Sequence, residues 1–343
     1  MRNSFMQSAS RFWAVLLGTV ALSLAAAYIH LTNGEFDMTV MEVVRTLLRI
    51  NPVPEHDLVI FEFRLPRIAI AALVGIGLGI AGAVIQGVTR NGLAEPGILG
   101  INAGAGAAIV FFMFVFKGEV ISQGLGSIMA MPLFGLIGGI GAAVLIYAFA
   151  YQNGRLDPQR LVLVGIAIGT GLGALTLFIA LKMNPNDFEM AVVWLTGSIW
   201  NANWVYFASM LPWFVLCIPF IIRGIRVLDL LQLEENSAKG LGVSVEKERG
   251  LLLLGSVGLV SACVSVSGSI AFIGLLSPHI AKRLVGLSHK HALPVSGAIG
   301  MLLVIGSDFI AKTVFSPAEL PVGIVISIVG VPYFVYLLLK AKG

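Results

Sequence analysis

The feature that most constrains this chain is a series of long apolar segments without any Asp, Glu, Lys or Arg. An α-helix needs about 20 mostly apolar residues to cross a hydrocarbon core, and in lipid only helices and closed barrels satisfy every backbone group. Only 12% of the 343 residues are charged, which excludes a soluble enzyme. The sequence therefore predicts an all-α integral membrane protein. Five clear spans are residues 12–34, 68–89, 96–116, 161–181 and 320–339.

Two longer uncharged segments each predict one further span. Residues 120–154 contain polar side chains near their start, so we expect one helix at about 126–150 behind an outer turn. Residues 190–222 are too long for one span and too short for two. We therefore expect a helix at 203–222 and a short broken or re-entrant segment at 191–200, because non-helical backbone at membrane depth is tolerated only where protein or water covers it.

The C-terminal third adds three spans. Residues 250–281 are uncharged but interrupted by the polar run 265–269, so two short spans are expected on either side of that turn. Residues 292–311 supply another span, with Asp308 near its end. The total is about ten transmembrane helices, with nine or eleven left open. Forty glycines agree with close helix packing in lipid, where small residues let helices approach each other.

The positions of the charged residues predict the orientation of the chain. Ten spans place both termini on one side. With the termini inside, the inner loops hold fifteen of the 22 Lys and Arg residues and only seven of the 18 Asp and Glu residues. Cytoplasmic loops are enriched in Lys and Arg, so both termini are predicted to be cytoplasmic. A signal peptide ending near residues 25–27 is the alternative for the first span, but its apolar run is longer than a usual signal core.

Missing motifs narrow the class of membrane protein. No Gly-Lys dipeptide occurs, so the chain lacks a Walker A phosphate loop, and any ATP hydrolysis belongs to another subunit. The five histidines and two cysteines form no metal-ligand pattern, which argues against a metalloenzyme. Ion-coupled carriers keep ionisable groups within the bilayer, and Asp308 is the nearest candidate. It is equally placed to pair with Lys312 one helical turn later.

The longest polar stretch on the predicted inner side is residues 226–249. Its leucines and acidic residues suggest two short amphipathic helices broken by glycines. An amphipathic helix offers an apolar face to a soluble partner. Two interpretations of this segment remain open at this point: a solvated surface loop and a docking element for a soluble partner.

Several motifs occur in order along the chain. They are residues 64–67, 82–86, 90–100, 194–198, 230–243, 267–280, 319–324 and 330–334, together with Asp308. In these motifs the chain resembles the FecCD-type permeases of bacterial ABC importers for ferric siderophores, haem and cobalamin, over almost its whole length after the first helix. Departures from the family pattern are Gly92 in place of Pro, Glu234 in place of Gly, Ser269 in place of Pro and Lys312 in place of Arg.

The resemblance implies a type II ABC importer permease architecture, with residues 1–343 forming a single polytopic domain in the bacterial cytoplasmic membrane. Two permease subunits, identical or paralogous, would surround the pathway in the lipid. A cytoplasmic ATPase dimer would bind ATP, an extracytoplasmic siderophore-binding protein would deliver cargo, and no nucleic acid or directly bound cofactor is implied. Ferric siderophore is the expected cargo, with cobalamin or haem as the alternative and an ion-coupled carrier as the rival class.

The resemblance also assigns residues. Within the cytoplasmic coupling segment 226–249, the residues expected to meet the ATPase are Leu230, Leu231, Leu233, Glu234, Glu235, Ala238, Lys239, Gly240, Leu241 and Gly242. Exposed charges expected to dock the binding protein are Arg64, Arg67 and Lys312, whose other interpretation is interfacial anchoring. The family's turn positions are Asn91, Leu93, Ala94, Pro96, Gly100, Gly268, Gly274, Pro278, His279, Pro321 and Gly323.

Two glycine-rich helices are interpreted as packing surfaces rather than substrate contacts. They carry glycines at 75, 77, 79 and 82 and at 165, 169, 171 and 173. His279 is expected to be a structural residue near the cytoplasmic boundary. No residue in the chain is expected to be a catalytic group or a metal ligand.

Overall fold

The computed structural model describes residues 2–341 except 35, 37, 51–52, 117–123, 153–154, 234, 242–243, 315 and 317. The described chain is almost entirely helical, with one two-stranded antiparallel hairpin. Its elements are α1 (Arg2–Thr32), α2 (Val40–Leu47), α3 (Pro54–Asp57), η1 (Leu58–Arg64), α4 (Leu65–Thr89), η2 (Pro96–Leu99), α5 (Ile101–Phe116), α6 (Gly124–Ala150), β1 (Tyr151–Gln152), β2 (Arg155–Leu156), α7 (Pro158–Ala180), α8 (Pro185–Leu195), α9 (Trp204–Arg223), α10 (Ile225–Leu230), α11 (Glu235–Gly240), α12 (Val245–Ser267), α13 (Ile273–Val285), α14 (His289–Thr313) and α15 (Val322–Ala341).

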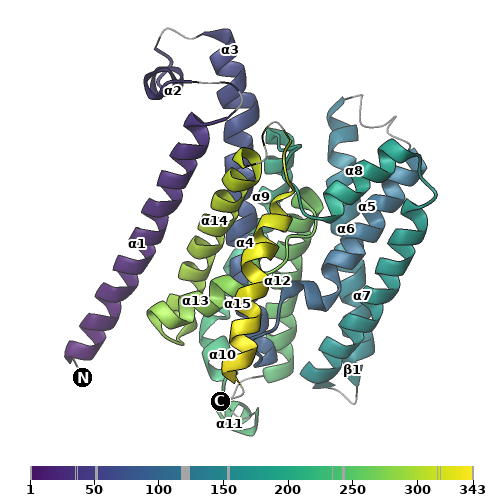
Figure 1. Cartoon of the computed structure of the whole chain (residues 1–343). Helices are drawn as coiled ribbons and strands as arrows, with labels where there is room; N and C mark the ends of the chain where they lie inside the picture. Colours follow the sequence, from purple (N-terminus) through teal and green to yellow (C-terminus); the bar gives the residue numbers. More distant parts are fainter. Residues whose placement is uncertain are drawn as a thin grey trace.

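Eight helices within the described residues are long and apolar enough to cross a membrane. They include α1, α6, α7, α9, α12, α14, α15 and the continuous helix formed by α3, η1 and α4. The other two predicted spans correspond to shorter helices, the 16-residue α5 and the 13-residue α13. The chain is therefore a multi-pass helical protein, and ten membrane crossings remain a prediction. Figure 1 places both termini at the same end of the molecule, as ten spans require.

Two predicted boundaries are wrong. The segment 250–281 does hold two helices on either side of a turn, but the turn begins at Gly268 rather than Ser265, and only α13 is short because α12 runs unbroken from Val245 to Ser267. The serines at 265 and 267 lie within α12, where each hydroxyl is satisfied by donating a hydrogen bond to a backbone carbonyl three or four residues earlier. The second span, predicted at 68–89 directly after the Arg-Leu-Pro-Arg motif, also starts earlier than predicted. The helix begins at Pro54 and passes through the π-helical segment η1 before α4.

The helix α2 was not predicted from the sequence. It is eight residues long and begins with a capping box, in which Thr39 and Glu42 satisfy each other's backbone N–H groups. Val43 packs with Met38 and Ile60 in a small cluster outside the main core. Figure 1 shows α2 and α3 beyond the end of α1, on the side opposite the chain termini.

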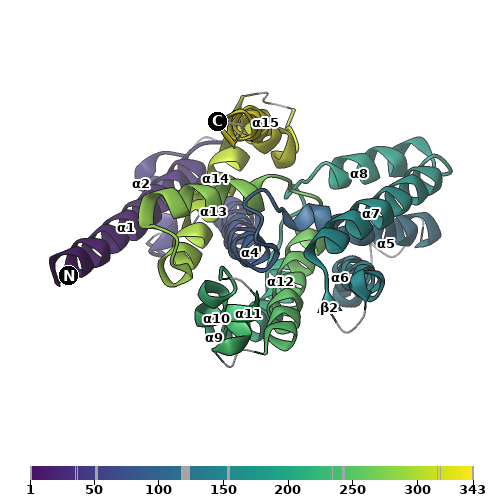
Figure 2. The ribbon, with the colours of Figure 1, turned by 90° about the horizontal axis from the view of Figure 1, so that it is seen from below.

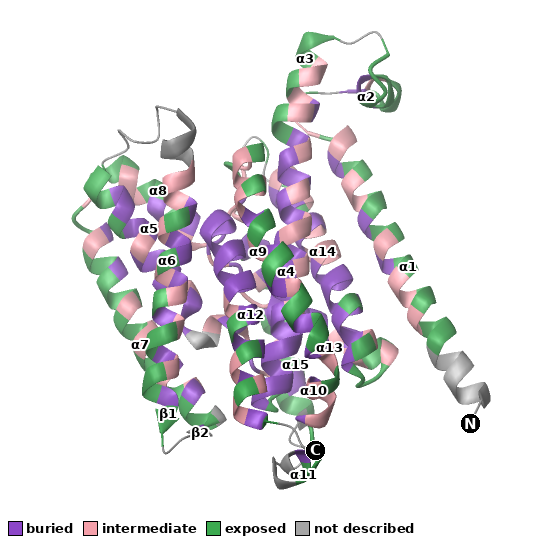
Figure 3. Cartoon of the chain, turned by 180° about the vertical axis from the view of Figure 1, so that it is seen from behind, coloured by how far each residue is buried: buried purple, intermediate pink, exposed green. Residues whose placement is uncertain are grey.

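The helices surround a central pair, α4 and α12. Figure 2 shows α1, α13 and α14 on one side of this pair and α5 to α8 on the other, with α9 and α15 at opposite edges. In Figure 3 the central helices are mostly buried, whereas α1 and α7 are largely exposed. Exposed Leu17 on α1, Leu163 on α7 and Val215 on α9 show that the outer surface is apolar, which is what contact with lipid requires.

Glycines allow α4 to pack closely, as predicted for residues 75–82. A β-carbon at Gly75 would overlap the Gly300 backbone of α14, and one at Gly82 would overlap the Gly274 backbone of α13. Such overlaps cannot be relieved by rotating a side chain. Small residues therefore set the distance between these helices, and dispersion contacts rather than a hydrophobic effect hold them together in lipid.

Candidate functional site

Three of the family motifs meet in one helix junction. The turn after α8, residues 196–198, lies between the C-terminus of α12 and the N-terminus of α15. The backbone N–H of Ser198 donates to the Ser267 carbonyl (2.8 Å), and the backbone N–H of Gly323 donates to the Gly197 carbonyl (2.9 Å). A β-carbon at Gly268, which has a φ of 68°, would overlap the Trp194 carbonyl oxygen. The segment expected at 191–200 is therefore the end of α8 and a turn locked between two helix ends.

Two cavities open beside this junction. The first has a volume of about 620 Å³ and lies between α5, α7, α8 and the loop after α12. The second, of about 590 Å³, lies between the end of α8 and α15. Leu195 and Ser269 line both cavities, so the junction forms their common wall. Most of the lining is apolar, with hydroxyl groups from Thr170, Thr176 and Ser327.

The glycines of α7 line the first cavity. Gly165, Gly169 and Gly173 all belong to its wall. A β-carbon at Gly171 or Gly173 would meet no atom of the described chain within 4 Å. No described residue of this chain packs against these two positions, so the prediction that this run is a packing surface stays untested there.

The turn at 91–100 connects α4 to the cavity wall. Asn91 accepts the Leu93 N–H through its side chain (3.0 Å), which closes the turn. Pro96 begins η2 and contacts Gly274, and Gly100 ends η2 with a φ of 66°. Ala94 is buried in the main core. The turn thereby holds the start of α13 beside the start of α5.

Glu95 is the half-buried acid of this turn. Its carboxylate accepts the backbone N–H of Phe272, the residue that precedes α13. Burial raises the pKa of the Glu95 carboxyl above its ordinary value, and the Phe272 hydrogen bond opposes that shift. On the α5 side, Asn102 donates to the Ser269 hydroxyl (2.9 Å). These two bonds fix residues 269–272, the irregular stretch that borders both cavities.

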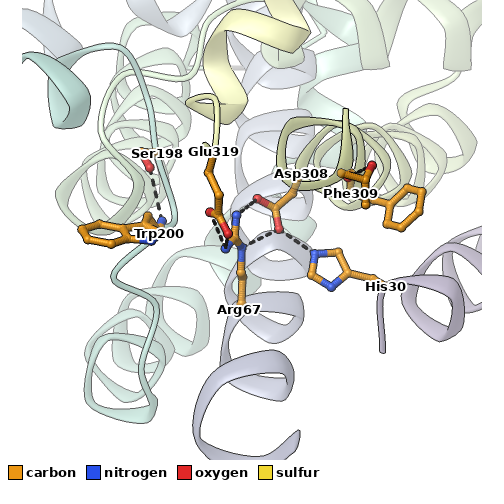
Figure 4. A network of polar contacts seen from close by, with 8 residues as sticks. His30, Arg67, Ser198, Trp200, Asp308, Phe309 and Glu319 are labelled. Atoms are coloured by element: carbon orange, nitrogen blue, oxygen red, sulfur yellow. Dashed lines mark hydrogen bonds and ion pairs between the residues drawn. The ribbon is translucent and has the colours of Figure 1, made fainter. Parts of the chain in front are cut away.

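Buried charges gather at the opposite end of the molecule from the termini. Arg67 on α4 donates two hydrogen bonds to Asp308 on α14 (2.8 and 2.9 Å) and pairs with Glu319 (2.8 Å). His30 on α1 contacts the same Asp308 carboxylate at 2.8 Å. Figure 4 shows these four side chains pointing toward one another from three helices and the segment before α15. We call them the outer ion network.

The expectation that Arg64 and Arg67 present exposed charges is wrong. Their exposed fractions are 3% and 9%. Arg64 donates to the Leu31 carbonyl at the end of α1 and to the Phe36 carbonyl (2.6 Å), so it holds the turn after α1. A guanidinium whose donors are engaged inside the chain does not offer them to a partner. Lys312 is half-buried beside Gly34 and Arg64.

Asp308 does not fit the role of an ion relay. Its exposed fraction is 1%, and its carboxylate is shared by Arg67 and His30 rather than directed toward either cavity. A proton-relaying carboxyl group needs access to water from one side at a time. The arrangement favours a role in holding α1, α4 and α14 together.

The segment 226–249 contains two short helices, as predicted. The break after α10 includes residues 231–233, and Gly240 ends α11 rather than dividing the pair. Leu228, Leu231 and Ala238 are buried, whereas Leu233 and Leu241 are 44% and 63% exposed. Leu230 is half-buried. Glu235, Lys239 and Gly240 lie on α11, while Glu234 and Gly242 lie outside the described residues.

The remaining motif residues lie in or next to α13 and α15. Pro278 is buried within α13, and His279 packs its ring edge-on against Tyr333 of α15 at 5.7 Å. Pro321 precedes α15, where its carbonyl accepts the Ile324 N–H. Within the described ranges, no group of three or more His, Cys, Asp and Glu side chains is placed to hold a metal ion.

Sequence reasoning missed several of these residues. His30, Glu319 and Asn102 were not singled out, because their partners lie 278, 252 and 167 residues away in the chain. Glu95 belongs to the motif at residues 90–100, but no role was predicted for it. An acid in a polar turn directly before a proline was the available signal, but its partner Phe272 lies 177 residues away in the chain.

Comparisons with known proteins agree with the motifs. The FecCD transport family matches residues 21–340. The iron-uptake system permease protein FeuC of Bacillus subtilis (strain 168) is 54% identical over 94% of this chain and 96% of its own length. The iron(3+)-hydroxamate import system permease protein FhuG of the same organism is 44% identical over 96% of this chain and 97% of its own length. A metal-chelate type ABC transporter, solved in an inward-facing conformation, superposes with a TM-score of 0.81 at 30% identity, covering 95% of this chain and 99% of its own.

Proposed function

The chain belongs to the FecCD transport family, and we propose that it is the permease subunit of an ABC importer that carries ferric siderophores across the bacterial cytoplasmic membrane. The observation that carries this proposal is the 54% identity, across nearly the whole chain, with a permease named for iron uptake. Members of this family are transport subunits rather than ATPases. Energy would therefore come from ATP bound to a partner subunit, and this chain would bind no cofactor itself.

The cavity walls suit such a cargo. Their apolar and hydroxyl groups offer no strong ligands for a bare metal ion, and a ferric siderophore enters with its iron already enclosed by the chelator. Weak, distributed contacts allow a bulky ligand to leave as well as to enter. The uncovered face of α7 would complete the pathway by meeting a second permease, either an identical copy or a paralogue.

The segment 226–249 would dock the partner ATPase. Leu233 and Leu241, which follow the ends of α10 and α11, expose apolar surface at the end of the molecule that carries both termini, which is the predicted cytoplasmic side. An apolar face on a short helix fits a groove in a folded partner. Glu234 and Glu235 would meet basic residues on that partner.

A substitution at Gly240 tests this docking. Gly240 ends α11, and a β-carbon there would meet no described atom within 4 Å. We therefore expect Gly240→Val to leave the permease folded while reducing co-purification of the ATPase and uncoupling hydrolysis from transport. The same change at Gly141, an open position on α6, is the control. Normal uptake by the Gly240 variant would contradict the docking role.

The extracytoplasmic binding protein would dock at the end that carries the outer ion network. Lys312 is the docking residue that we retain, because it is half-buried rather than buried. Arg64 and Arg67 would take part only if the network opened. Charge pairs at such a rim set association rate and orientation more than affinity.

Cellular uptake of radioactive iron tests the cargo. Strains with and without this gene are given iron on hydroxamate, catecholate and citrate-type siderophores. Loss of uptake for one chelate class supports the proposal and names the substrate. Full retention of iron uptake, with cobalamin or haem uptake lost instead, would keep the importer and replace its cargo. Uptake that persists with the partner ATPase inactivated would favour an ion-coupled carrier.

A further inference from the structure

The segment 226–249 is tied to the transmembrane helices at both of its ends. At the upstream end, Asp229 on α10 accepts the backbone N–H of His289 (2.9 Å) and contacts the His289 ring at Nδ1 (2.7 Å). The Ser288 hydroxyl donates to its second oxygen at 3.3 Å. We call Asp229, Ser288 and His289 the upstream clamp. Arg90, at the end of α4, donates to the Leu231 carbonyl beside it (2.6 Å).

The upstream clamp replaces a missing helix cap. Ser288 is the residue before α14, yet its side chain makes no capping bond to that helix. The first turn of a helix leaves N–H groups unsatisfied and favours a nearby negative charge. Asp229 supplies both the acceptor and the charge from a different helix. The N-terminus of α14 is therefore bound to α10 rather than merely adjacent to it.

The downstream end has its own clamp. Glu246, in the first turn of α12, accepts the backbone N–H of Leu156 (2.9 Å), and Arg249 donates to the Leu156 carbonyl (3.2 Å). Arg249 also pairs with Glu246 at 3.4 Å. Leu156 lies in the hairpin between α6 and α7, and both Leu156 and Arg249 are almost fully buried. We call Leu156, Glu246 and Arg249 the downstream clamp.

The two clamps reach opposite sides of the bundle. The upstream clamp holds α14, which packs against α4, and Figure 2 shows α14 on the other side of the central helices from α7. The downstream clamp holds the hairpin that begins α7, whose glycines line the larger cavity. If the segment 226–249 moves, the upstream clamp therefore pulls on α14 and the downstream clamp pulls on α7, through two separate sets of hydrogen bonds.

We propose that Asp229 and Glu246 are positioning residues of the transport cycle, which transmit movement of the segment 226–249 to α14 and to the cavity wall on α7. The inference rests on the proposed function in one respect, since the movement is supplied by a partner ATPase. Neither residue contacts the cargo. Their role is to keep the segment and the two helices moving as one body.

The test uses the complete importer, with both permeases, the ATPase and the binding protein, in liposomes. The variants are Asp229→Ala and Glu246→Ala, with Asp229→Asn and Glu246→Gln as milder changes that keep the side-chain shape. Arg160→Gln, which neutralises an exposed charge at the start of α7, is the matched control. The first readout is the number of ATP molecules hydrolysed per iron imported, because a purely structural defect lowers both rates together and leaves their ratio unchanged.

The second readout needs no cargo. Spin labels at Thr170→Cys on α7 and Ser327→Cys on α15 report the distance across the cavities, and the native Cys217 and Cys263 are buried. In the wild type and the Arg160 variant, ATP should change this distance. In the clamp variants the change should be lost, and ATP consumed per iron should rise about fivefold or more, the scale of a typical coupling free energy.

The outcomes separate the two proposals. One outcome is a wild-type complex that changes the distance between the spin labels with ATP and yet imports no ferric siderophore. That result would refute the proposed cargo, and the role of the clamps would then be decided by the label distance in the clamp variants. Assembled clamp variants with a normal distance change and a normal ATP ratio would overturn the role of the clamps. If an alanine variant does not assemble, the Asn and Gln variants decide by the same two readouts.

Discussion

Charged side chains in this protein bind backbone groups where helices begin or end, and they come from other helices or loops. Glu95 and Asp229, both half-buried, accept N–H groups at the starts of α13 and α14. The buried Arg64 donates to the Leu31 carbonyl at the end of α1. A helix terminus leaves several backbone groups without partners, and in a membrane protein water does not satisfy all of them. A single charged side chain can satisfy such a terminus and join two segments at once.

We expect Arg67→Met to destabilise the protein more than any exposed charge substitution. Asp308 and Glu319 would face each other without the guanidinium, and removing one partner of a buried ion pair costs about 3–5 kcal/mol. Thermal unfolding of the purified protein in detergent measures the loss.

Arg49→Met is the control for Arg67. Arg49 pairs with Asp57, but its side chain is 59% exposed, and such pairs contribute about 0–1 kcal/mol. Adding Asp308→Asn to the Arg67 variant should recover part of the stability, because it removes the unpaired charge. Equal losses for Arg49→Met and Arg67→Met would show that the outer ion network does not stabilise the fold.

The raised pKa of Glu95 predicts a pH-dependent stability difference. A carboxyl whose pKa is raised on folding binds its proton more tightly in the folded state, so the protein loses stability as pH rises from the unfolded pKa through the folded one. Glu95→Gln keeps an oxygen acceptor for the Phe272 N–H but cannot ionise. The variant should match the wild type at about pH 4 and exceed it in stability at about pH 8. Denaturation in detergent at both pH values checks this, and a difference independent of pH would contradict it.

At the scale of whole helices, the sequence predicted most spans correctly. Long uncharged runs located α1, α6, α7, α9, α14 and α15 within a few residues, because hydropathy is the dominant constraint in lipid. The errors came from signals that compete with hydropathy. The serines at 265 and 267 suggested a turn, yet their hydroxyls bond back to the helix, and charges between 54 and 64 hid the outer part of the helix that continues as α4.

Glycine patterns were the least decisive signal at this scale. The same spacing occurs on α4, where glycines meet the backbones of α13 and α14, and on α7, where they face a cavity. Sequence spacing shows that a helix has a face of small residues but does not show what lies opposite that face. The candidate site was therefore predictable as a set of motifs, while the cavity and the clamps required the positions of residues distant in the chain.

Alanine substitutions distinguish these two kinds of glycine. A β-carbon at Gly75 would overlap the Gly300 carbonyl, so Gly75→Ala should force α4 and α14 apart and cost about 1–3 kcal/mol, as overpacking does. Gly171→Ala adds a methyl group to open space and should be neutral or stabilising, by up to about 1 kcal/mol from helix propensity. Thermal unfolding of the two variants measures the contrast. Similar stabilities would show that the α4 contact is not close-packed.

At the scale of the whole molecule, the bundle has an asymmetric architecture. One side is a close-packed unit built on α4, α13 and α14 and fastened by the outer ion network. The other side presents α7 as an exposed wall, with the locked turn after α8 between the two cavities. Such a division suits a transporter, because one side keeps its shape while the wall of the cavity is free to meet a second subunit and a cargo.

Filling the larger cavity tests whether it is part of the transport route. Gly173 lines this cavity and has no described atom within 4 Å of its β position, so Gly173→Leu should fold normally while narrowing the space. We expect a loss of uptake that increases with the size of the ferric siderophore, because a larger chelate has less room to avoid the added side chain. Gly141→Leu, at an open position on α6, should have no such effect. Uptake of radioactive iron by both variants, normalised to the amount of protein in the membrane, gives the comparison, and equal uptake of every chelate would place the route elsewhere.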